Sequence, residues 1–316
     1  MKILVTGGAG FIGSHVVDAL VREGHQVVVV DDLSMGRREQ VSPAARFHQV
    51  DIRQRDAIGE VFRAERPELI NHHAAQGNLR RSMEEPSFDA SVNTVGSLIL
   101  LELSLAYGVR KFVYISSGGA VYGEPQRLPV DECHPIRPLS AYGVSKYSVE
   151  QYLDLFGGAS GLDYTILRYG NVYGPRQDPR GEAGVVAIFS RQMLAGQRPT
   201  IFGDGTKTRD YVYVDDIVRA NLLVMGETRA AGRVYNLGLG REVSDRQIFE
   251  LVRSAVGVTV EPTLAAKRAG EIDRICLDAS RAKAELGWEP TIPLEEGIAR
   301  TVAFYRGEEG WVRKRD

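Results

Sequence analysis

The chain has 316 residues, of which 43% are hydrophobic and 25% charged, and its formal net charge is −2. This composition is typical of a globular protein with one large or two modest domains, and it predicts neither a nucleic-acid-binding face nor a membrane-surface helix. The cysteines, Cys133 and Cys276, form no Cys-x-x-Cys pair, so neither a disulfide framework nor a metal site is expected. We find no signal-peptide pattern and no apolar run of membrane-spanning length, which predicts a cytoplasmic protein without membrane contact.

The first half of the chain alternates strand and helix patterns. We expect strands at 3–5, 26–30, 46–50, 68–72 and 111–116, helices at 11–22, 57–65 and 93–107, and a further helix beginning near Ala141. Such alternation predicts right-handed βαβ units and therefore an α/β fold with a doubly wound parallel sheet. The Pro-rich stretch 124–138 is expected to be a surface loop.

Beyond about Gly170 the pattern is less regular, with short strands and few helices expected. We interpret residues 1–170 as a dinucleotide-binding domain of the Rossmann type, to which segments near 210–240 return. Residues 171–316 are then a smaller α/β lobe for the substrate.

A glycine-rich turn follows the first strand and opens the first helix. Gly7, Gly10 and Gly13 are spaced so that the backbone can turn tightly and bring the N–H groups of a helix start to a pyrophosphate. A plain strand-to-helix turn is the alternative, and the strand before and helix after the glycines favour the binding role.

The second strand pattern ends at Asp31, where a carboxylate can receive the ribose hydroxyls of a dinucleotide. Asp32 follows, and two carboxylates there would repel the extra phosphate of NADP, so NAD is the expected cofactor. Arg37 and Arg38 lie nearby and could bind a phosphate instead. Asp51, after the third strand, is placed to accept a hydrogen bond from the adenine amino group.

Tyr142 and Lys146 are four residues apart, so on a helix they share one face. An ammonium near a phenol favours the phenolate and lowers a pKa that is otherwise about 10. The pair therefore predicts a tyrosine general acid/base, against the alternative of an ordinary surface pair. Ser116 and Ser117 end the fifth strand, where a hydroxyl can bond the reacting substrate oxygen, although a Ser/Gly turn would look the same.

These motifs together resemble the extended short-chain dehydrogenase/reductase family, and within it the UDP-glucose 4-epimerases. The resemblance runs over nearly the whole chain and includes, besides the motifs above, the stretches 73–76, 121–123, 168–175, 181–189, 201–205, 209–216 and 236–238. It implies NAD as cofactor, a UDP-sugar as substrate, a homodimer built on helices 93–107 and 142–156, and Tyr142, Lys146 and Ser117 as catalytic residues. For NAD it implies Gly7, Gly10, Phe11, Ile12, Gly13, Asp31, Asp32, Leu33, Ser34, Gly36, Asp51, Ile52, Ala74, Ala75, Gln76, Asn93, Ser116, Tyr142, Lys146 and Tyr169. For the UDP-sugar it implies Ser117, Tyr142, Asn171, Val185, Val186, Thr200, Phe202, Arg209 and Arg268.

Two positions depart from the family pattern. Gly118 stands where many of these epimerases have a Ser or Thr four residues before the tyrosine that matches Tyr122, which leaves Ser117 as the expected catalytic serine and Ser116 as the alternative. Residues 268–271 are Arg-Ala-Gly-Glu where the family often has Arg-Pro-Gly-Asp, and Arg268 still matches.

Other functions remain open at this point. A 4,6-dehydratase would carry Asp-Glu where this chain has Gly119 and Ala120, and a UDP-uronate enzyme needs a carboxylate-binding group that the sequence does not identify. Ile275 occupies the position that gates N-acetylated sugars in the family, and it is neither bulky and aromatic nor very small. A non-catalytic dinucleotide sensor has no need of Tyr142 and Lys146.

Overall fold

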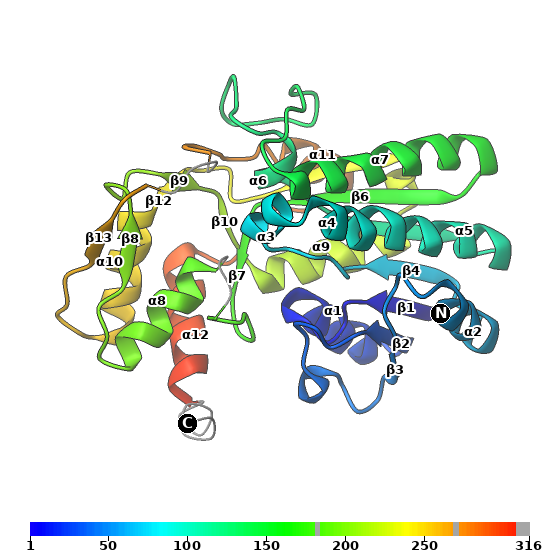
Figure 1. Cartoon of the computed structure of the whole chain (residues 1–316), viewed down its shortest axis with the longest axis horizontal. Helices are drawn as coiled ribbons and strands as arrows, with labels where there is room; N and C mark the ends of the chain where they lie inside the picture. The colour runs from blue at the N-terminus through cyan, green and yellow to red at the C-terminus, as the bar shows by residue number, and fades with distance from the viewer. Residues whose placement is uncertain (181–183, 268–271, 308–316) are drawn as a thin grey trace.

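The computed structural model describes residues 1–180, 184–267 and 272–307. Its centre is a parallel sheet of seven strands in the order β11-β6-β5-β4-β1-β2-β3 (Figure 1). The strands are β1 (Lys2–Thr6), β2 (Gln26–Asp31), β3 (Arg46–Gln49), β4 (Leu69–His72), β5 (Lys111–Ser117), β6 (Asp163–Tyr169) and β11 (Arg233–Leu237). The expected α/β fold with a doubly wound parallel sheet is confirmed, and the order turns back at β1 between β2 and β4.

Helices cover both faces of this sheet, which is why strands such as β1 and β2 are largely apolar and buried. On one face, α1 (Phe11–Arg22), α9 (Val214–Gly226) and α11 (Ser280–Leu286) pack with side chains such as Ile3 and Val5. On the other, α2 (Arg55–Glu65), α5 (Ser97–Tyr107) and α7 (Ala141–Ser160) pack with residues such as Leu4. Successive strand residues point to opposite faces, so one short strand serves both cores.

The helix expected at 93–107 is longer and less regular than predicted. After α3 (Leu79–Glu84), the chain runs through α4 (Pro86–Ala90) and a π-helical segment η2 (Ser91–Gly96) into α5. The stretch Pro86–Tyr107 has a mean hydropathy of 1.3 and is long and apolar enough to span a membrane, contrary to the sequence-based expectation that no run approaches that length. Leu100 and Leu101, on α5, are buried in the core between this helix and the sheet. A buried core helix can be as long and as apolar as a membrane-spanning helix.

The C-terminal lobe is richer in helices than expected, and the prediction of few helices there is wrong. It contains α8 (Val185–Leu194), α10 (Asp245–Val256) and α12 (Leu294–Gly307), with the paired strands β8 (Thr200–Phe202) and β13 (Thr263–Ala265) (Figure 1). Another short pair is β9 (Thr208–Arg209) with β12 (Val243–Ser244). These helices pack on one another around a separate apolar cluster, so tertiary contacts stabilise segments whose local patterns are weak.

Short segments join the sheet to the lobe. Strand β7 (Asn171–Tyr173) continues from β6 and pairs in parallel with β10 (Tyr211–Tyr213), which leads directly into α9. The short helix α6 (Gly118–Val121) follows β5, and the short helical turns η1 (Arg38–Gln40) and η3 (Thr228–Ala230) complete the described elements. The loop 124–138 is tied to the lobe side by a bridge from buried Val130 to Leu277. The carboxyl ends of the parallel strands thus share one edge, beside which the lobe is attached.

Candidate active site

The glycine-rich turn between β1 and α1 is tightly constrained. Gly7 has φ +68°, and a Cβ there would lie 2.6 Å from the Ala74 nitrogen. A Cβ on Gly13 would lie 2.2 Å from the Gly7 carbonyl oxygen. Gly10 is the N-cap of α1, and no side chain caps this end of the helix. The first N–H groups of α1 are therefore left for an external anion, as a bound pyrophosphate requires. Phe11, Ile12 and Gly13 form the first turn of that helix.

Asp31 lies at the end of β2 and connects the loops around this turn. Its carboxylate accepts hydrogen bonds from the backbone N–H of Ala9 at 3.0 Å and of Leu33 at 2.9 Å. Burial raises the pKa of Asp31, and the two backbone bonds oppose that rise. A Cβ on Gly36 would meet the Asp31 carboxylate at 2.8 Å, so the chain passes close to this group.

The remaining residues predicted at the adenosine end surround this corner. The exposed carboxylate of Asp32 accepts both the N–H and the hydroxyl of Ser34. Asp51 is held by the guanidinium of Arg53, which lowers the pKa of Asp51. Ile52 is buried against Gly96. These neighbours place Asp31, Asp32, Leu33, Ser34 and Gly36 around one corner beside the glycine-rich turn.

The loop after β4 is held against the helix that follows it. The N–H of Gln76 donates to Oδ1 of Asn93 at 2.8 Å, and Nδ2 of Asn93 donates back to the carbonyl of Gln76 at 3.0 Å. The N–H of Ala74 donates to Thr6 Oγ1, so this loop also contacts the end of β1. Ala75 lies between these contacts. Asn93 is thus fixed within the π-helical turn, an irregularity that is frequent at functional sites.

Tyr142 and Lys146 lie on the first turns of α7, next to the ends of β4 and β5. Lys146 is buried, and its Nζ lies 4.4 Å from the centre of the Tyr114 ring. Burial lowers the pKa of Lys146 to about 7, while the carboxylates of Glu150 and Asp89 raise it. This lysine is therefore poised to change its charge near neutral pH.

The predicted lowering of the Tyr142 pKa is not found in the protein chain alone. Burial raises the pKa of Tyr142 to about 12, the charge of Asp89 adds to the rise, and an interaction with Ser117 opposes it. The phenolate is disfavoured because few polar groups solvate it there. A positive charge next to the phenol would oppose this rise and favour the phenolate.

The structure distinguishes the two neighbouring serines. The hydroxyl of Ser116 is buried and donates to Oε1 of Glu150 at 2.5 Å, whereas Ser117 interacts with the Tyr142 phenol. A Cβ on Gly118 would lie 2.6 Å from a side-chain carbon of Leu277, which gives a steric reason for glycine at this position. Ser117 is therefore the serine whose hydroxyl faces the predicted acid/base.

Behind Tyr142 and Lys146 lies a buried polar network that the sequence interpretation missed. The guanidinium of Arg168 binds both carboxylate oxygens of Glu150, at 3.1 and 2.5 Å, and donates to the Tyr122 hydroxyl at 2.7 Å. The Tyr122 hydroxyl in turn donates to Oδ1 of Asn236 on β11 at 2.8 Å. The sequence offered one indication of this network, which is that Glu150 lies one helical turn after Lys146. A single Glu at that spacing is not sufficient to predict a buried ion pair.

Other predicted residues lie at the lobe side of the same edge. Tyr169 ends β6, and its buried hydroxyl accepts a bond from Asn221 at 2.7 Å. Asn171 begins β7, Val185 and Val186 begin α8, and Arg209 ends β9. Thr200 and Phe202 lie at the two ends of β8. The predicted Arg268 lies outside the described residues.

Asp210, next to Arg209, is a second buried carboxylate that the sequence did not single out. It accepts the backbone N–H groups of Leu239 at 2.6 Å, Gly240 at 3.1 Å and Leu277 at 2.9 Å. Burial raises the pKa of Asp210 to about 7, and these bonds oppose the rise. It holds three remote segments together where the sheet meets the lobe.

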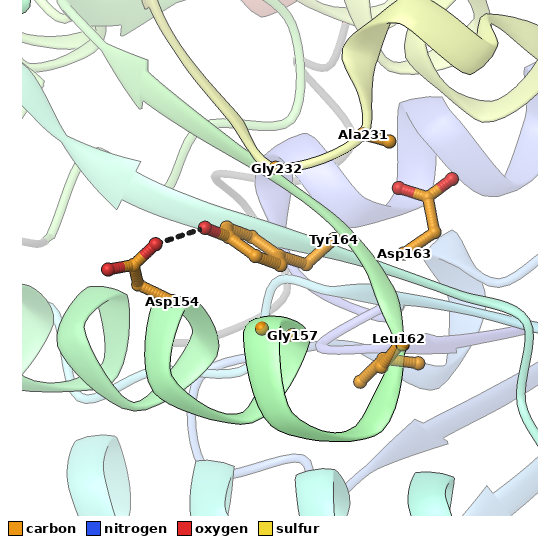
Figure 2. Close-up of a pocket in the computed structure, with 9 residues that line it drawn as sticks. Asp154, Gly157, Leu162, Asp163, Tyr164, Ala231 and Gly232 are labelled. Carbon is orange, nitrogen blue, oxygen red and sulfur yellow. Dashed lines mark hydrogen bonds between the residues drawn. The ribbon is translucent and has the colours of Figure 1, made fainter.

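One surface hollow lies away from these residues. Figure 2 shows it between the end of α7 and the start of β6, where Asp154 accepts a hydrogen bond from the Tyr164 hydroxyl at 2.8 Å. None of the predicted site residues lines it. Across the described parts of the chain, no group of His, Cys, Asp and Glu side chains is arranged to hold a metal ion.

Comparison with known proteins identifies similar chains. A model of the family described as NAD dependent epimerase/dehydratase matches residues 3–238. A UDP-glucose 4-epimerase from Mycolicibacterium smegmatis is 46% identical over 313 residues, covering 98% of this chain and 99% of that protein. The crystal structure of a UDP-glucose 4-epimerase with UDP-glucose from Thermotoga maritima superposes with a TM-score of 0.95 at 50% identity, covering 98% of this chain and 99% of that one. For a Thermus thermophilus UDP-glucose 4-epimerase complex with NAD, the TM-score is 0.92 and the identity 43%, over 97% of this chain and 99% of that one.

Proposed function

Because the chain belongs to the NAD dependent epimerase/dehydratase family, we propose that it is a UDP-glucose 4-epimerase that interconverts UDP-glucose and UDP-galactose. The observation that carries this proposal is the arrangement of Tyr142 and Ser117 at the carboxyl edge of the sheet, with Lys146 one turn along α7. The edge also contains the glycine-rich turn, so acid/base and dinucleotide-binding groups meet in one place.

In the proposed reaction, Tyr142 removes the proton from the sugar O4 hydroxyl, and the hydroxyl of Ser117 bonds the same oxygen. NAD, when bound, accepts the hydride from C4 and returns it. The resulting 4-keto sugar turns within the pocket while its UDP group stays anchored, so that the hydride would return to the opposite face of C4, and Tyr142 gives the proton back to O4. A single residue therefore serves as base and acid in one cycle.

Positive charges from Lys146 and the cofactor would lower the raised pKa of Tyr142. Burial disfavours the phenolate in the protein chain alone, as its pKa of about 12 indicates. The positive charge of oxidised NAD and that of protonated Lys146 both favour the phenolate. The proton is therefore expected to leave Tyr142 only in the loaded enzyme, which couples its basicity to the presence of the oxidant.

We assign the cofactor to the residues that fit it. The uncapped start of α1, with Gly10, Phe11, Ile12 and Gly13, holds the pyrophosphate, and Asp31 receives the adenosine ribose. The nearby carboxylate of Asp32 disfavours the additional phosphate of NADP. Toward the nicotinamide, we assign Asn93 and Lys146, with the loop of Ala74, Ala75 and Gln76 beside them.

The UDP group is assigned to the lobe. Arg209 supplies charge for the diphosphate, Phe202 packs beside the uracil and ribose, and Asn171 contributes polar contact. Arg268 and the start of α8 at Val185 complete this assignment. We divide the chain accordingly into an NAD-binding unit, residues 1–170 with segments near 210–240, and a substrate lobe from residue 171 onward.

We further propose a homodimer that works in the cytoplasm in galactose metabolism. Val95 on η2 and Val144, Tyr152 and Leu155 on α7 are large apolar side chains that are exposed in the single chain. The two elements pack side by side, so these side chains supply apolar surface for a helical interface between two copies.

A coupled assay tests the function. Purified protein is given UDP-galactose, and the formation of UDP-glucose is followed without added reductant, with Tyr142→Phe as the comparison. Turnover that falls by about 10²–10⁴-fold in Tyr142→Phe supports the proposal. No turnover in a wild-type protein that still binds NAD and UDP would overturn it and direct the search to UDP-N-acetylhexosamines and UDP-uronates.

A further inference from the structure

Asp89 is a buried carboxylate on the short helix α4, and it contacts three parts of the candidate active site. Its side chain is only 1% exposed. Oδ1 accepts hydrogen bonds from Nε2 of Gln76 at 2.9 Å and from Nδ2 of Asn93 at 3.0 Å. Oδ2 accepts from the hydroxyl of Ser145 at 2.7 Å. One carboxylate thus joins the loop after β4, the π-helical turn and α7.

Its three hydrogen-bonding partners are all neutral, which distinguishes it from the other buried acid nearby. Glu150 is also buried, but Arg168 binds both of its oxygens. Asp89 takes part in no ion pair with any residue that the structure describes. A buried carboxylate that is not matched by a cation costs free energy, so its retention points to a use for the charge.

The nearest candidates for that use are the two groups of the proposed acid/base pair. Ser145, which bonds Asp89, is the immediate neighbour of Lys146 on α7. The negative charge of Asp89 raises the pKa of Lys146 and also that of Tyr142. It therefore favours a protonated lysine and at the same time restrains the tyrosine from losing its proton.

We propose that Asp89 is a positioning residue for the Tyr142–Lys146 pair, through the negative charge that its buried carboxylate supplies beside them. The charge keeps the ammonium protonated, as phenolate stabilisation requires, and the three hydrogen bonds hold the surrounding elements in place. The inference rests on the proposed acid/base role of Tyr142. It adds a counter-charge from α4, outside the helix that carries the pair.

Other groups around the pair are accounted for. On α7, Glu150 also raises the pKa of Lys146, but its charge is shared with Arg168. On β4 and the residue after it, burial holds the pKa of both His72 and His73 well below the ordinary value, so both rings are neutral near pH 7. On β5, burial raises the pKa of Tyr114, so its phenol stays protonated. Of the two carboxylates that raise the pKa of Lys146, Glu150 is paired with Arg168, and Asp89 is not paired with an arginine in the described part of the chain.

The test is the variant Asp89→Asn, which removes the charge and keeps the size. Because the charge raises both pKa values, its loss should move both limbs of the pH profile of kcat to lower pH, by about one unit. The KM for UDP-galactose should change little, since Asp89 lies outside the proposed UDP contacts. Asp216→Asn is the control: Asp216, on α9, is also 1% exposed, but it accepts a hydrogen bond from the N–H of Thr291 and forms an ion pair with Arg219. Its pH profile should keep the wild-type midpoints.

A second readout does not depend on turnover. In NAD-loaded protein, the phenolate absorbance of Tyr142 is taken as the difference between each protein and its Tyr142→Phe counterpart, and it is followed against pH. Its midpoint should also move to lower pH in Asp89→Asn. If wild-type protein shows no epimerisation, the proposed function fails, and this titration still decides the role of Asp89.

Unchanged midpoints with a lower maximal rate would show a merely structural residue and overturn the inference. If Asp89→Asn does not fold, because its amide faces the N–H donors of Gln76 and Asn93, Asp89→Ser takes its place. Its hydroxyl accepts a hydrogen bond without adding an opposed amide. The same shift is expected of that variant, and its absence counts equally against the inference.

Discussion

The central sheet and the C-terminal lobe place functional groups in different ways. In the sheet, most of the predicted cofactor residues lie at or shortly after the end of a strand of four to seven residues, so local chain direction determines their position. In the lobe, β8 and β13 have three residues each and pair segments more than 60 residues apart, Thr200 with Thr263. The sheet therefore fixes its site by short-range connections, and the lobe by long-range packing.

This difference predicts a separation of phenotypes. Substitutions at the site residues of the sheet region should impair NAD retention or the acid/base step and leave the affinity for UDP unchanged. Substitutions at the site residues of the lobe should weaken UDP binding and leave NAD retention unchanged. Asp210 accepts hydrogen bonds from segments that connect the two regions, so its substitution should impair both NAD retention and UDP binding.

The largest effect is expected from Arg168→Met, which leaves the buried carboxylate of Glu150 without its cation. Breaking a buried ion pair in this way costs about 3–5 kcal/mol of unfolding free energy. Denaturant unfolding of the two proteins measures it. The double variant with Glu150→Leu should recover much of the loss, and a double variant as unstable as the single one would contradict the explanation.

Gly13→Ala should be nearly as damaging and should act on the cofactor first. The new Cβ would lie 2.2 Å from the Gly7 carbonyl oxygen, so the turn that receives the pyrophosphate must move. We expect loss of retained NAD on gel filtration and about 3 kcal/mol lower stability, with unchanged UDP affinity. Gly59→Ala on α2 is the control, since no atom lies within 4 Å of its new Cβ. Normal NAD retention in Gly13→Ala would contradict the assignment of this turn.

Arg209→Ala tests the lobe. Losing charged hydrogen bonds to a diphosphate costs about 1.5–3 kcal/mol, so the Kd for UDP should rise by about 10–100-fold, measured by calorimetry. NAD retention and the pH profile should stay as in the wild type. The exposed Arg246, in the same lobe, provides the control Arg246→Ala. Equal effects of the two substitutions would remove Arg209 from the proposed site.

The last prediction is a gain in stability from Lys146→Met at the expense of activity. The folded-state pKa of Lys146, about 7, lies below the unfolded value of about 10.4. Below pH 7 the lysine is charged in both states and its burial cost is fully present, and as pH rises toward 10.4 the folded protein releases the proton and the cost disappears. Lys146→Met should therefore be more stable than the wild type at pH 6, and the difference in unfolding free energy should shrink as pH rises and vanish near pH 10. If the difference in unfolding free energy between Lys146→Met and the wild type did not change with pH, the lowered pKa of the buried Lys146 would be contradicted.

The sequence by itself determined the first five strands of the central sheet, β1 to β5, while β6 and β11 were not predicted. Apolar runs, glycines with fixed spacing and a carboxylate at a strand end are local signals, because each depends on residues adjacent in the chain. The helix 11–22 was predicted with the bounds that the structure has, and the first strands were predicted within a residue or two. The Tyr142–Lys146 pair was found because four-residue spacing on a helix fixes a shared face.

Only the tertiary structure decided how the charges around that pair are balanced. The contact of Asp89 with Ser145 joins residues 56 positions apart, and that of Glu150 with Arg168 joins residues on different elements. The burial that raises the Tyr142 pKa to about 12 also arises from packing, which no local pattern encodes. Desolvation and charge pairing depend on which segments meet in space, so the sequence could identify the acid/base residue and not its electrostatic state.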